Sequence, residues 1–377
     1  MTKLIDICDI QYGYAFDSAC FTEDDSYLPL VRIRDVKRGF SETFYSGEYP
    51  EEYVIHKGDL IVGMDGEFNI ARWKSIDALL NQRVCKLKAK EGTNEEYLRF
   101  ALVKALKTIE DKTAFVTVKH LSAKELNKLE LDMPGIEEQN VRAESMAKLE
   151  KVISHRKEEL SALDNLIKAR FVEMFGNPVT NEKGWNQKQL GEITTKLGSG
   201  ATPKGGKEAY QEDGITLIRS MNVHNGLFEY KELAHISEEQ ATKLDNVTIE
   251  ENDVLLNITG ASVARSCVVP SKILPARVNQ HVCIIRCNQR IVPEFLNKLL
   301  IDDNYQRLLW SIAWGGATRE AITKQQVESL KIIVPPIELQ NQFADFVHQV
   351  DKSKVAVQKA LDETQMLFDS LMQKYFA

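Results

Sequence analysis

The sequence predicts two copies of one unit, each a globular segment of strands and helices closed by one long helix. Three observations support this fold. The stretches 136–175 and 337–376 contain neither Gly nor Pro, and the first is rich in residues that lose least on becoming helical. The two stretches align without a gap, so that Pro134 matches Pro335. The order of strand-like and helix-like runs before the first long stretch recurs before the second.

The first globular segment occupies residues 1–133. Short runs rich in β-branched and aliphatic residues are bounded by Gly, Asp and Ser, which is typical of strands, and two helical runs follow them. The predicted strands are 28–36, 59–64 and 82–88, and the predicted helices are 95–109 and 121–129.

A long helix is predicted over the central segment 134–177. Its apolar side chains recur in alternating steps of three and four residues, a 3.5-residue period that indicates a helix packed lengthwise against another. Gly176 followed by Pro178 ends it, as expected of a helix stop. The predicted seam on this helix consists of Leu149, Ile153, Leu160, Leu163 and Ile167.

The second globular segment, 178–334, repeats the first. The pair Asn81-Gln82 recurs as Asn279-Gln280, and the offset between matching runs grows along the chain, which indicates loop insertions in the second copy. Loops that differ on a shared scaffold suit two different recognition surfaces. The matching strands are 215–223, 253–258 and 280–286, and the matching helices are 293–312 and 322–330.

The segment 335–377 is predicted to be the partner helix of the central one. Its seam is interrupted by the polar residues Lys354 and Thr364. At 1.5 Å per residue, each long helix would measure about 60 Å. The predicted seam residues here are Val350, Val357, Leu361, Phe368 and Leu371.

Composition and charge narrow the function classes. The six cysteines form no CxxC pair, so reduced, buried thiols are expected rather than a zinc ribbon or a disulfide framework. No apolar run reaches the length of about 18 residues that a membrane span needs, and no signal core opens the chain, so a cytoplasmic location without a membrane partner is expected. The net charge is −7 and no segment is basic overall, so any nucleic-acid contact must come from local clusters.

No constellation of residues predicts catalysis or a metal site. The run GSGATPKGGK (198–207) misses the P-loop spacing, and Glu208 stands in the Ser/Thr position, so a surface loop is expected. Asp59, Asp65 and Glu67 could suggest a metal-dependent nuclease, but Asp65-Gly66 is a common hairpin turn. The sequence contains none of the motifs G-x-S-x-G, H-E-x-x-H and G-x-G-x-x-G.

Polar and basic side chains on the predicted loops are the candidate DNA contacts. Arg and Lys suit guanine edges and phosphates, whereas Asn and Gln suit adenine. The alternative for any single residue is a solvated surface charge, and the Asn-Gln pairs could instead hold loops by hydrogen bonds. The candidates are Arg32, Arg34, Lys37, Arg72, Lys74, Lys112 and Lys119 in the first copy, and Thr202, Lys204, Lys207, Arg219, Asn222, His224, Arg265, Trp314 and Arg319 in the second.

With these motifs in order, the chain resembles the DNA-specificity subunit of Type I restriction-modification systems over essentially its whole length. Gly135 stands where a second proline is usual, and Leu339 where a second glutamate is usual. The resemblance is carried by GYAFDS (13–18), GDLIVGMDGE (58–67) and PGIEEQN (134–140) in the first copy, and by GSGATP (198–203), DVLLNITGASVARS (253–266) and VPPIELQNQ (334–342) in the second.

The resemblance implies a pseudo-two-fold α+β protein: two target recognition domains, joined by two long helices that pair as an antiparallel coiled coil. Each domain would read one half of a bipartite, asymmetric site in double-stranded DNA. Two methyltransferase subunits, which bind S-adenosylmethionine and methylate adenine, would dock on the helices, and restriction/translocase subunits using ATP and Mg would join them. The chain itself would be a non-catalytic specificity subunit without a cofactor.

The helix length fits this reading, since two readers on one DNA face should lie about 34 Å apart or somewhat more. The alternative is a coiled-coil scaffold with two protein-binding domains and no DNA role. That alternative explains the long helices and the acidity, but not the sets of Arg, Lys and Asn on matching loops.

Overall fold

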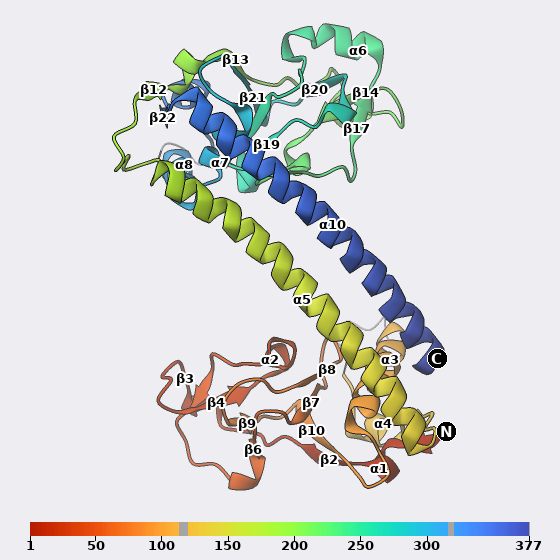
Figure 1. Cartoon of the computed structure of the whole chain (residues 1–377). Coiled ribbons are helices and arrows are strands. Elements are labelled where there is room, and N and C mark those ends of the chain that lie inside the picture. The colour runs from red at the N-terminus through yellow and green to blue at the C-terminus, as the bar shows by residue number, and fades with distance from the viewer. Residues whose placement is uncertain (113–119, 316–319, 377) are drawn as a thin grey trace. The chain divides into compact units, whose positions relative to one another are not determined.

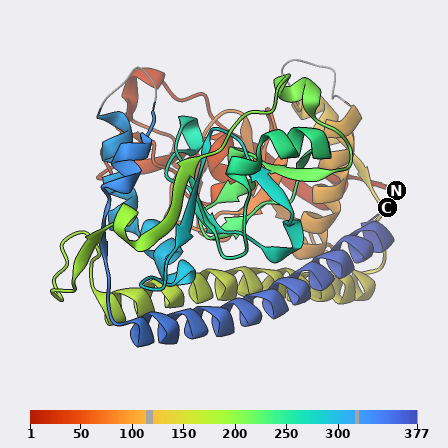
Figure 2. The same cartoon turned by 90° about the horizontal axis from the view of Figure 1, so that it is seen from above.

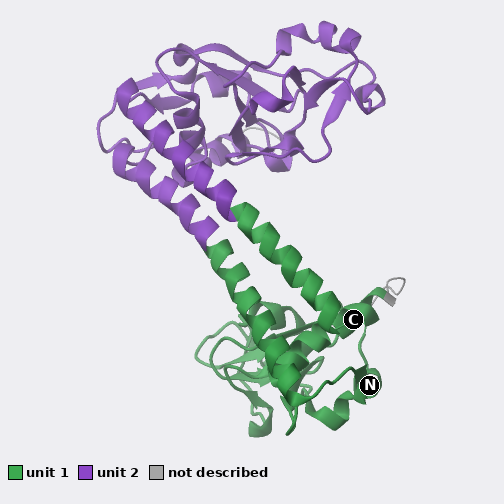
Figure 3. Ribbon diagram, turned by 45° about the vertical axis from the view of Figure 1, so that its right-hand side comes forward, with its two compact units in different colours: residues 1–158, 358–377 green, residues 159–357 purple. Residues whose placement is uncertain are grey.

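The computed structural model describes residues 1–112, 120–315 and 320–376 (Figure 1). The chain divides into two compact units, shown in Figure 3. Unit 1 comprises Met1–Glu158 and Gln358–Ala377, and unit 2 comprises Glu159–Val357. The globular part of the first copy therefore lies in unit 1 and that of the second copy in unit 2, while both long helices contribute to both units.

Unit 1 is built around two sheets. The first is antiparallel with strand order β2-β10-β7-β8, and the second has the order β3-β5-β4-β9-β6, in which β4 and β9 are parallel. Their strands are β2 Cys8–Tyr12, β3 Phe21–Thr22, β4 Leu28–Val31, β5 Phe44–Tyr45, β6 Val54–Ile55, β7 Leu60–Gly63, β8 Asn69–Arg72, β9 Ala78–Leu80 and β10 Val84–Ala89. Around them lie the pair β1 Thr2–Lys3 and β11 Glu130–Leu131, and the helices α1 Leu4–Ile7, α2 Ile33–Arg38, α3 Glu95–Lys112 and α4 Ala123–Lys128.

Unit 2 repeats the four-stranded sheet of unit 1 and the parallel strand pair in the second sheet. Its four-stranded sheet has the order β13-β21-β18-β19, and a second sheet, β17-β14-β20, again contains a parallel pair, β14 with β20. The strands are β12 Gln187–Gln189, β13 Thr194–Ser199, β14 Ile215–Ile218, β15 Val223–His224, β16 Leu227–Phe228, β17 Ala234–Ile236, β18 Val254–Asn257, β19 Ser266–Val268, β20 Ala276–Val278, β21 Val282–Cys287 and β22 Lys331–Ile333. The helices are α6 Glu238–Lys243, α7 Pro293–Leu300, α8 Asp303–Trp314 and α9 Lys324–Glu328. The repeat is confirmed.

Three predicted elements were wrong in extent, and side-chain caps explain each difference. The strand predicted over 28–36 ends at Val31, because Asp35 Oδ2 accepts the Arg32 backbone N–H at 2.9 Å and starts α2. The strand predicted over 215–223 ends at Ile218, where Asn222 Oδ1 accepts the N–H of Arg219 at 3.0 Å. The helix predicted over 293–312 is two helices, because Asp302 Oδ1 accepts the backbone N–H groups of Asn304 and Tyr305 and begins α8.

The two long helices are α5 Ile136–Phe175 and α10 Ile337–Phe376, and they lie within the segments 134–177 and 335–377 for which long helices were predicted. They lie side by side within each unit (Figures 1 and 2). In unit 1, Arg142 near the start of α5 donates to the backbone carbonyl of Tyr375 near the end of α10 at 2.8 Å. In unit 2, Lys354 Nζ of α10 lies 2.5 Å from Asp164 Oδ1 of α5. As the residue number rises along α5 from Arg142 to Asp164, the number of its partner on α10 falls from Tyr375 to Lys354, so the two helices run antiparallel.

Burial along the helices follows the seam. Ile153, Ile167, Val350, Val357 and Leu361 are each less than one-tenth exposed. The other five seam residues, Leu149, Leu160, Leu163, Phe368 and Leu371, are half-buried. Lys354, one of the two polar interruptions, is the residue that pairs with Asp164.

The six thiols are free; Cys8, Cys85, Cys267 and Cys283 are buried, and Cys20 and Cys287 are half-buried. In the described part of the chain, no helix combines the length and the apolar character that crossing a membrane requires. The described residues also contain no group of three or more His, Cys, Asp or Glu side chains placed to hold a metal ion.

Candidate nucleic-acid interface

In the first copy, exposed basic side chains gather on α2 and beside it. Arg32 immediately precedes the helix, Arg34 Nη2 lies 3.3 Å from Thr43 Oγ1, and Lys37 Nζ forms an ion pair with Glu67 Oε1 at 3.0 Å. Lys74 is exposed and its backbone N–H donates to the carbonyl of Gly39, which ends α2 at φ +79°. Each of these cations is open to solvent, so α2 presents a basic surface.

Arg72 has a different environment. Its guanidinium donates to Glu95 Oε1 at 2.8 Å, to Glu96 Oε1 at 2.5 Å and to the carbonyl of Gly58 at 2.7 Å. The network continues from Glu96 through Arg99 to Glu150 of α5. Arg72 thus ties β8 to α3 inside unit 1, and its guanidinium is engaged by three acceptors of that unit.

Asn222 of the second copy is also a structural residue. Its side chain is fully buried, and its Nδ2 donates to the carbonyls of Glu229 at 3.0 Å and Lys231 at 3.2 Å. Its Oδ1 caps Arg219, as Asp35 caps Arg32 in the first copy. The buried amide is bonded on both sides to backbone groups of its own loop, so Asn222 has a structural role in this copy.

The remaining candidates of the second copy divide into two groups. Thr202, Lys204 and Lys207 are exposed on the segment that follows β13. Arg219 and Arg265 are half-buried and held by neighbours: the Arg219 guanidinium lies 5.6 Å from the ring centroid of Tyr210, and Arg265 Nη1 lies 3.5 Å from His224 Nδ1. The first group is free to contact phosphates, whereas the second is held by intramolecular contacts.

Trp314, the last residue of α8, is 69% exposed, and its ring meets that of Trp310 edge-to-face at a centroid distance of 6.1 Å. An exposed aromatic ring offers a stacking surface. Lys112 ends α3 in the matching place of the first copy. Lys119 and Arg319 lie outside the described residues.

The structure also brings together residues that the sequence analysis did not select as DNA contacts. Asp65, between β7 and β8, contacts the imidazole of His120, and Arg83 Nη1 lies 3.1 Å from His120 Nδ1. The signal in the sequence was the repeated Asn-Gln pair, since Arg83 follows Asn81-Gln82 directly, as His281 follows Asn279-Gln280.

The Asn-Gln pairs themselves are structural, which confirms the alternative considered for them. Asn81 Oδ1 accepts the backbone N–H of Gln82 at 2.9 Å, and Asn279 Oδ1 accepts that of His281 at 3.1 Å. Both asparagines are buried, and a glycine packs on each turn: a Cβ at Gly13 would meet the Asn81 carbonyl oxygen at 2.0 Å, and one at Gly200 the Asn279 oxygen at 2.2 Å. Asp65-Gly66 lies in the antiparallel β7–β8 connection, as predicted.

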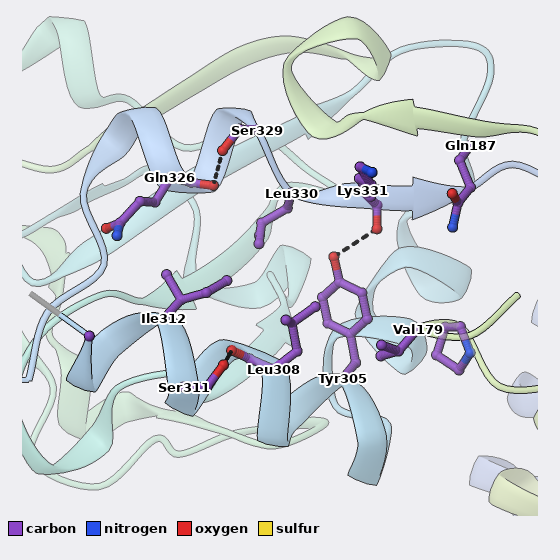
Figure 4. A pocket seen from close by; sticks show the side chains of 12 residues that line it. Val179, Gln187, Tyr305, Leu308, Ser311, Ile312, Gln326, Ser329, Leu330 and Lys331 are labelled. Carbon is purple, nitrogen blue, oxygen red and sulfur yellow. Dashed lines mark hydrogen bonds between the residues drawn. The ribbon is translucent and has the colours of Figure 1, made fainter.

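A pocket of about 570 Å³ in unit 2 lies between α8, α9 and the segment before β12 (Figure 4). Its lining is mostly apolar, and the titratable side chains in it are Tyr305 and Lys331. The Tyr305 hydroxyl donates to the Lys331 carbonyl at 3.0 Å, and burial raises the pKa of this phenol. Such a lining offers no general acid and base pair for catalysis.

The sequence and the fold of this chain are similar to those of known proteins. Residues 1–164 and 182–364 match the family described as the Type I restriction modification DNA specificity domain. The chain is 30% identical over 404 residues to the Type I restriction enzyme EcoBI specificity subunit of Escherichia coli, covering 98% of this chain and 84% of that protein. It is 20% identical over 359 residues to the MjaVIII specificity subunit of Methanocaldococcus jannaschii, covering 90% and 84% respectively.

Two solved structures share the fold. The S subunit of a Type I restriction-modification system from M. genitalium matches with a TM-score of 0.61 at 16% identity, covering 100% of this chain and 95% of that one. A chain from a structural study of complex assembly and conformational transition in the type I R-M system matches with a TM-score of 0.55 at 17% identity, covering 100% and 96%.

Proposed function

Because the chain belongs to the family of Type I restriction-modification DNA-specificity subunits, we propose that its two copies read the two halves of a bipartite, asymmetric site in double-stranded DNA. The observation that carries this proposal is the duplication. The two copies share the strand order of their four-stranded sheets and the caps made by Asp35 and Asn222, yet the side chains on matching loops differ. Two copies of one fold can read two different half-sites if the loops that contact DNA carry different side chains.

The target recognition domains in this proposal are residues 1–133 and 178–334, and the spacer helices are 134–177 and 335–377. The bounds of α5 and α10 support these limits. The helices pair antiparallel within each unit, and each helix starts in the unit where the other ends, as spacer helices shared by both copies require.

In this proposal, adenine methylation and DNA cleavage are catalysed by partner subunits. The curated relatives are named specificity subunits, which supports a chain that directs adenine methylation or ATP-dependent cleavage without performing either. S-adenosylmethionine, ATP and Mg would be bound by two methyltransferase subunits and by the restriction subunits. Because these reactions act on cellular DNA, we place the assembled complex in the cytoplasm.

The long helices carry exposed apolar side chains that suit a protein partner. Val141 and Val152 of α5 are 62% and 41% exposed and are separated by three helical turns, so they lie on one face. On α10, Val355 and Met366 are 70% and 64% exposed and have the same spacing. Burying such side chains against methyltransferase subunits would stabilise the complex.

The proposed function is tested by methylation mapping. The chain is expressed with its methyltransferase subunits in a host without other adenine methylation, and modified adenines are located by sequencing. We expect one bipartite motif with a fixed spacer. A complex that assembles but neither methylates a bipartite motif nor shows salt-dependent binding to duplex DNA would contradict the proposal and favour the protein-scaffold alternative.

A further inference from the structure

Three loops meet at the same place in both copies, and their backbones are bonded alike. In the first copy, the Met64 N–H donates to the Arg83 carbonyl at 2.8 Å, and the Leu121 N–H to the Met64 carbonyl at 2.7 Å. In the second, Ile258 donates to the His281 carbonyl at 3.0 Å and Ile322 to the Ile258 carbonyl at 2.8 Å. A β-bridge joins Asp65 to His120, and another joins Thr259 to Ala321. We call this arrangement the three-loop cluster.

The side chains of the three-loop cluster in the first copy form a polar group. Arg83 Nε lies 3.5 Å from Asp65 Oδ2, and Arg83 Nη1 lies 3.1 Å from His120 Nδ1. Asp65 also contacts the imidazole of His120. About half of the Arg83 side chain, 51%, is exposed, against 22% for Asp65. The carboxylate therefore lies behind the guanidinium and holds it, while the guanidinium reaches solvent.

The second copy has different residues at all three of these positions and no ion pair among them. Thr259 stands in the place of Asp65, and its Oγ1 lies 2.6 Å from Nδ1 of His281, which stands in the place of Arg83. Ala321 replaces His120 and has no polar side-chain atom. The cluster thus keeps its backbone pattern between the copies and changes its side chains at all three positions.

Arg83 also has an unusual backbone. Its φ is +73°, in the left-handed region that L-residues rarely adopt, whereas the matching His281 is not among the described residues with positive φ. Residues held in such conformations cluster at functional sites. A half-exposed arginine ion pair contributes little to stability, so the fold itself gains little from aiming Arg83 at Asp65.

We propose that the three-loop cluster carries specificity-determining residues, and that Arg83, oriented by Asp65, reads a guanine in the first half-site. This inference rests on the proposed function and names the residue and base for one of its half-sites. Arginine donates two parallel hydrogen bonds to the O6 and N7 atoms of guanine. A phosphate contact fits less well, because the Asp65 carboxylate cancels the charge of Arg83 and would repel the DNA backbone.

The three-loop cluster of the second copy reads a base through His281. With Thr259 engaging Nδ1, the other ring nitrogen, Nε2, faces Gln280 Nε2 at 3.3 Å. Once a base takes the place of the Gln280 amide, this single imidazole nitrogen offers one hydrogen bond where Arg83 offers two. The second half-site is therefore read differently although the loops have the same backbone pattern.

The test uses the full chain in complex with its methyltransferase subunits and maps methylated adenines for Arg83→Gln. We expect discrimination at one guanine of one half-site to fall by about 10- to 100-fold, with the other half-site and the spacer unchanged. The matched control is Lys90→Gln. Lys90 follows β10 where Arg83 precedes it, is 40% exposed and also has a carboxylate neighbour, Asp9, at 3.6 Å. The control should keep the wild-type motif.

A second variant exchanges the whole cluster: Asp65→Thr, Arg83→His and His120→Ala, which installs the side chains of the second copy on loops with the same backbone hydrogen bonds. It should change the base preference of the first half-site while the complex still assembles. The inference is overturned if Arg83→Gln keeps full discrimination, or if it weakens all sequences equally, as the loss of a phosphate contact would. A wild-type complex without a bipartite motif would instead defeat the proposed function itself.

Discussion

Gln139 and Gln340 make the same hydrogen bonds at the N-terminal ends of the two long helices. Gln139 Nε2 donates to the Pro134 carbonyl and Gln340 Nε2 to the Pro335 carbonyl, both at 2.8 Å. The Oε1 of Gln139 accepts the backbone N–H of Asn94, and that of Gln340 accepts the N–H of Val292, both at 2.9 Å. Both amides are buried, so each copy fastens its long helix to its globular part in the same way.

Gln340→Leu should therefore destabilise unit 2. The substitution leaves the Val292 N–H and the Pro335 carbonyl buried without this partner, at a cost of about 1–3 kcal/mol. Urea unfolding of the purified chain measures the loss. Gln342→Leu is the control, because Gln342 is exposed on the same helix and should change stability by no more than about 0.5 kcal/mol. Equal effects of the two variants would show that the buried bonds contribute nothing.

Leu361→Asp should disrupt the helix pair in unit 1. Leu361 is 9% exposed, and a carboxylate there would be buried without a cation, which costs several kcal/mol. We expect the complex with methyltransferase subunits to be lost on a sizing column before the globular parts unfold. Leu367→Asp, on the same helix but 50% exposed, should be far milder for folding of the chain. An intact complex with Leu361→Asp would refute the seam.

Asn222→Ala separates a structural role from a base-reading role. Because Asn222 is fully buried and bonded on both sides, its loss should lower the free energy of unfolding by about 1–3 kcal/mol. At a temperature where the variant stays folded, its methylation motif should match the wild type. A relaxed adenine position in an otherwise stable protein would show instead that Asn222 reads a base.

The cysteines give a pH-dependent prediction. Burial raises the pKa of the Cys8, Cys267 and Cys283 thiols to about 12, above the value of about 8.5 in an unfolded chain. Since the folded state favours the protonated thiols, their contribution to stability is present at lower pH and is lost as pH rises from about 9 toward 12. Thermal unfolding followed across this range should show that decline, and Cys267→Ala should reduce it.

Thiol labelling at about pH 8 checks the same burial directly. Cys20 is half-buried, whereas burial also raises the pKa of the half-buried Cys287 to about 12. Cys20 should therefore react first with a disulfide reagent in the folded chain, and Cys20→Ser should remove that fast phase. Rapid reaction of several thiols in the Cys20→Ser variant would contradict the burial of the others.

The long helices could be predicted because their signals are local: a 3.5-residue apolar period in both, and a Gly-Asn-Pro stop after the first. The extents of the runs around Asp35 and Asn222 were predicted wrongly because one side-chain oxygen, capping the residue three positions earlier, outweighs the strand preference of the residues between. The partners of Arg72 could not be predicted from the sequence for another reason. Its partners, Glu95 and Glu96, lie more than twenty residues away and meet it only in the fold.

The three-loop cluster could not be predicted from the sequence for a similar reason. Asp65, Arg83 and His120 come from three separate loops, and no pattern within one loop connects them. The repeated Asn-Gln pair marked the position of Arg83, but its own role is to hold the turn. What the duplication adds is a comparison within one chain: positions with matching backbone bonds and unlike side chains can be read off directly.

Independent reading of the two half-sites is tested by methylation mapping after exchange of residues 178–334 for the same segment of a relative with a different motif. One half-site should change to that of the relative, while the other half-site and the spacer length stay as they were. The Arg83→Gln variant, mapped in parallel, should then affect the half-site that the exchange leaves unaltered. If exchanging one segment changes both half-sites together, the two copies do not read DNA independently and the account is wrong.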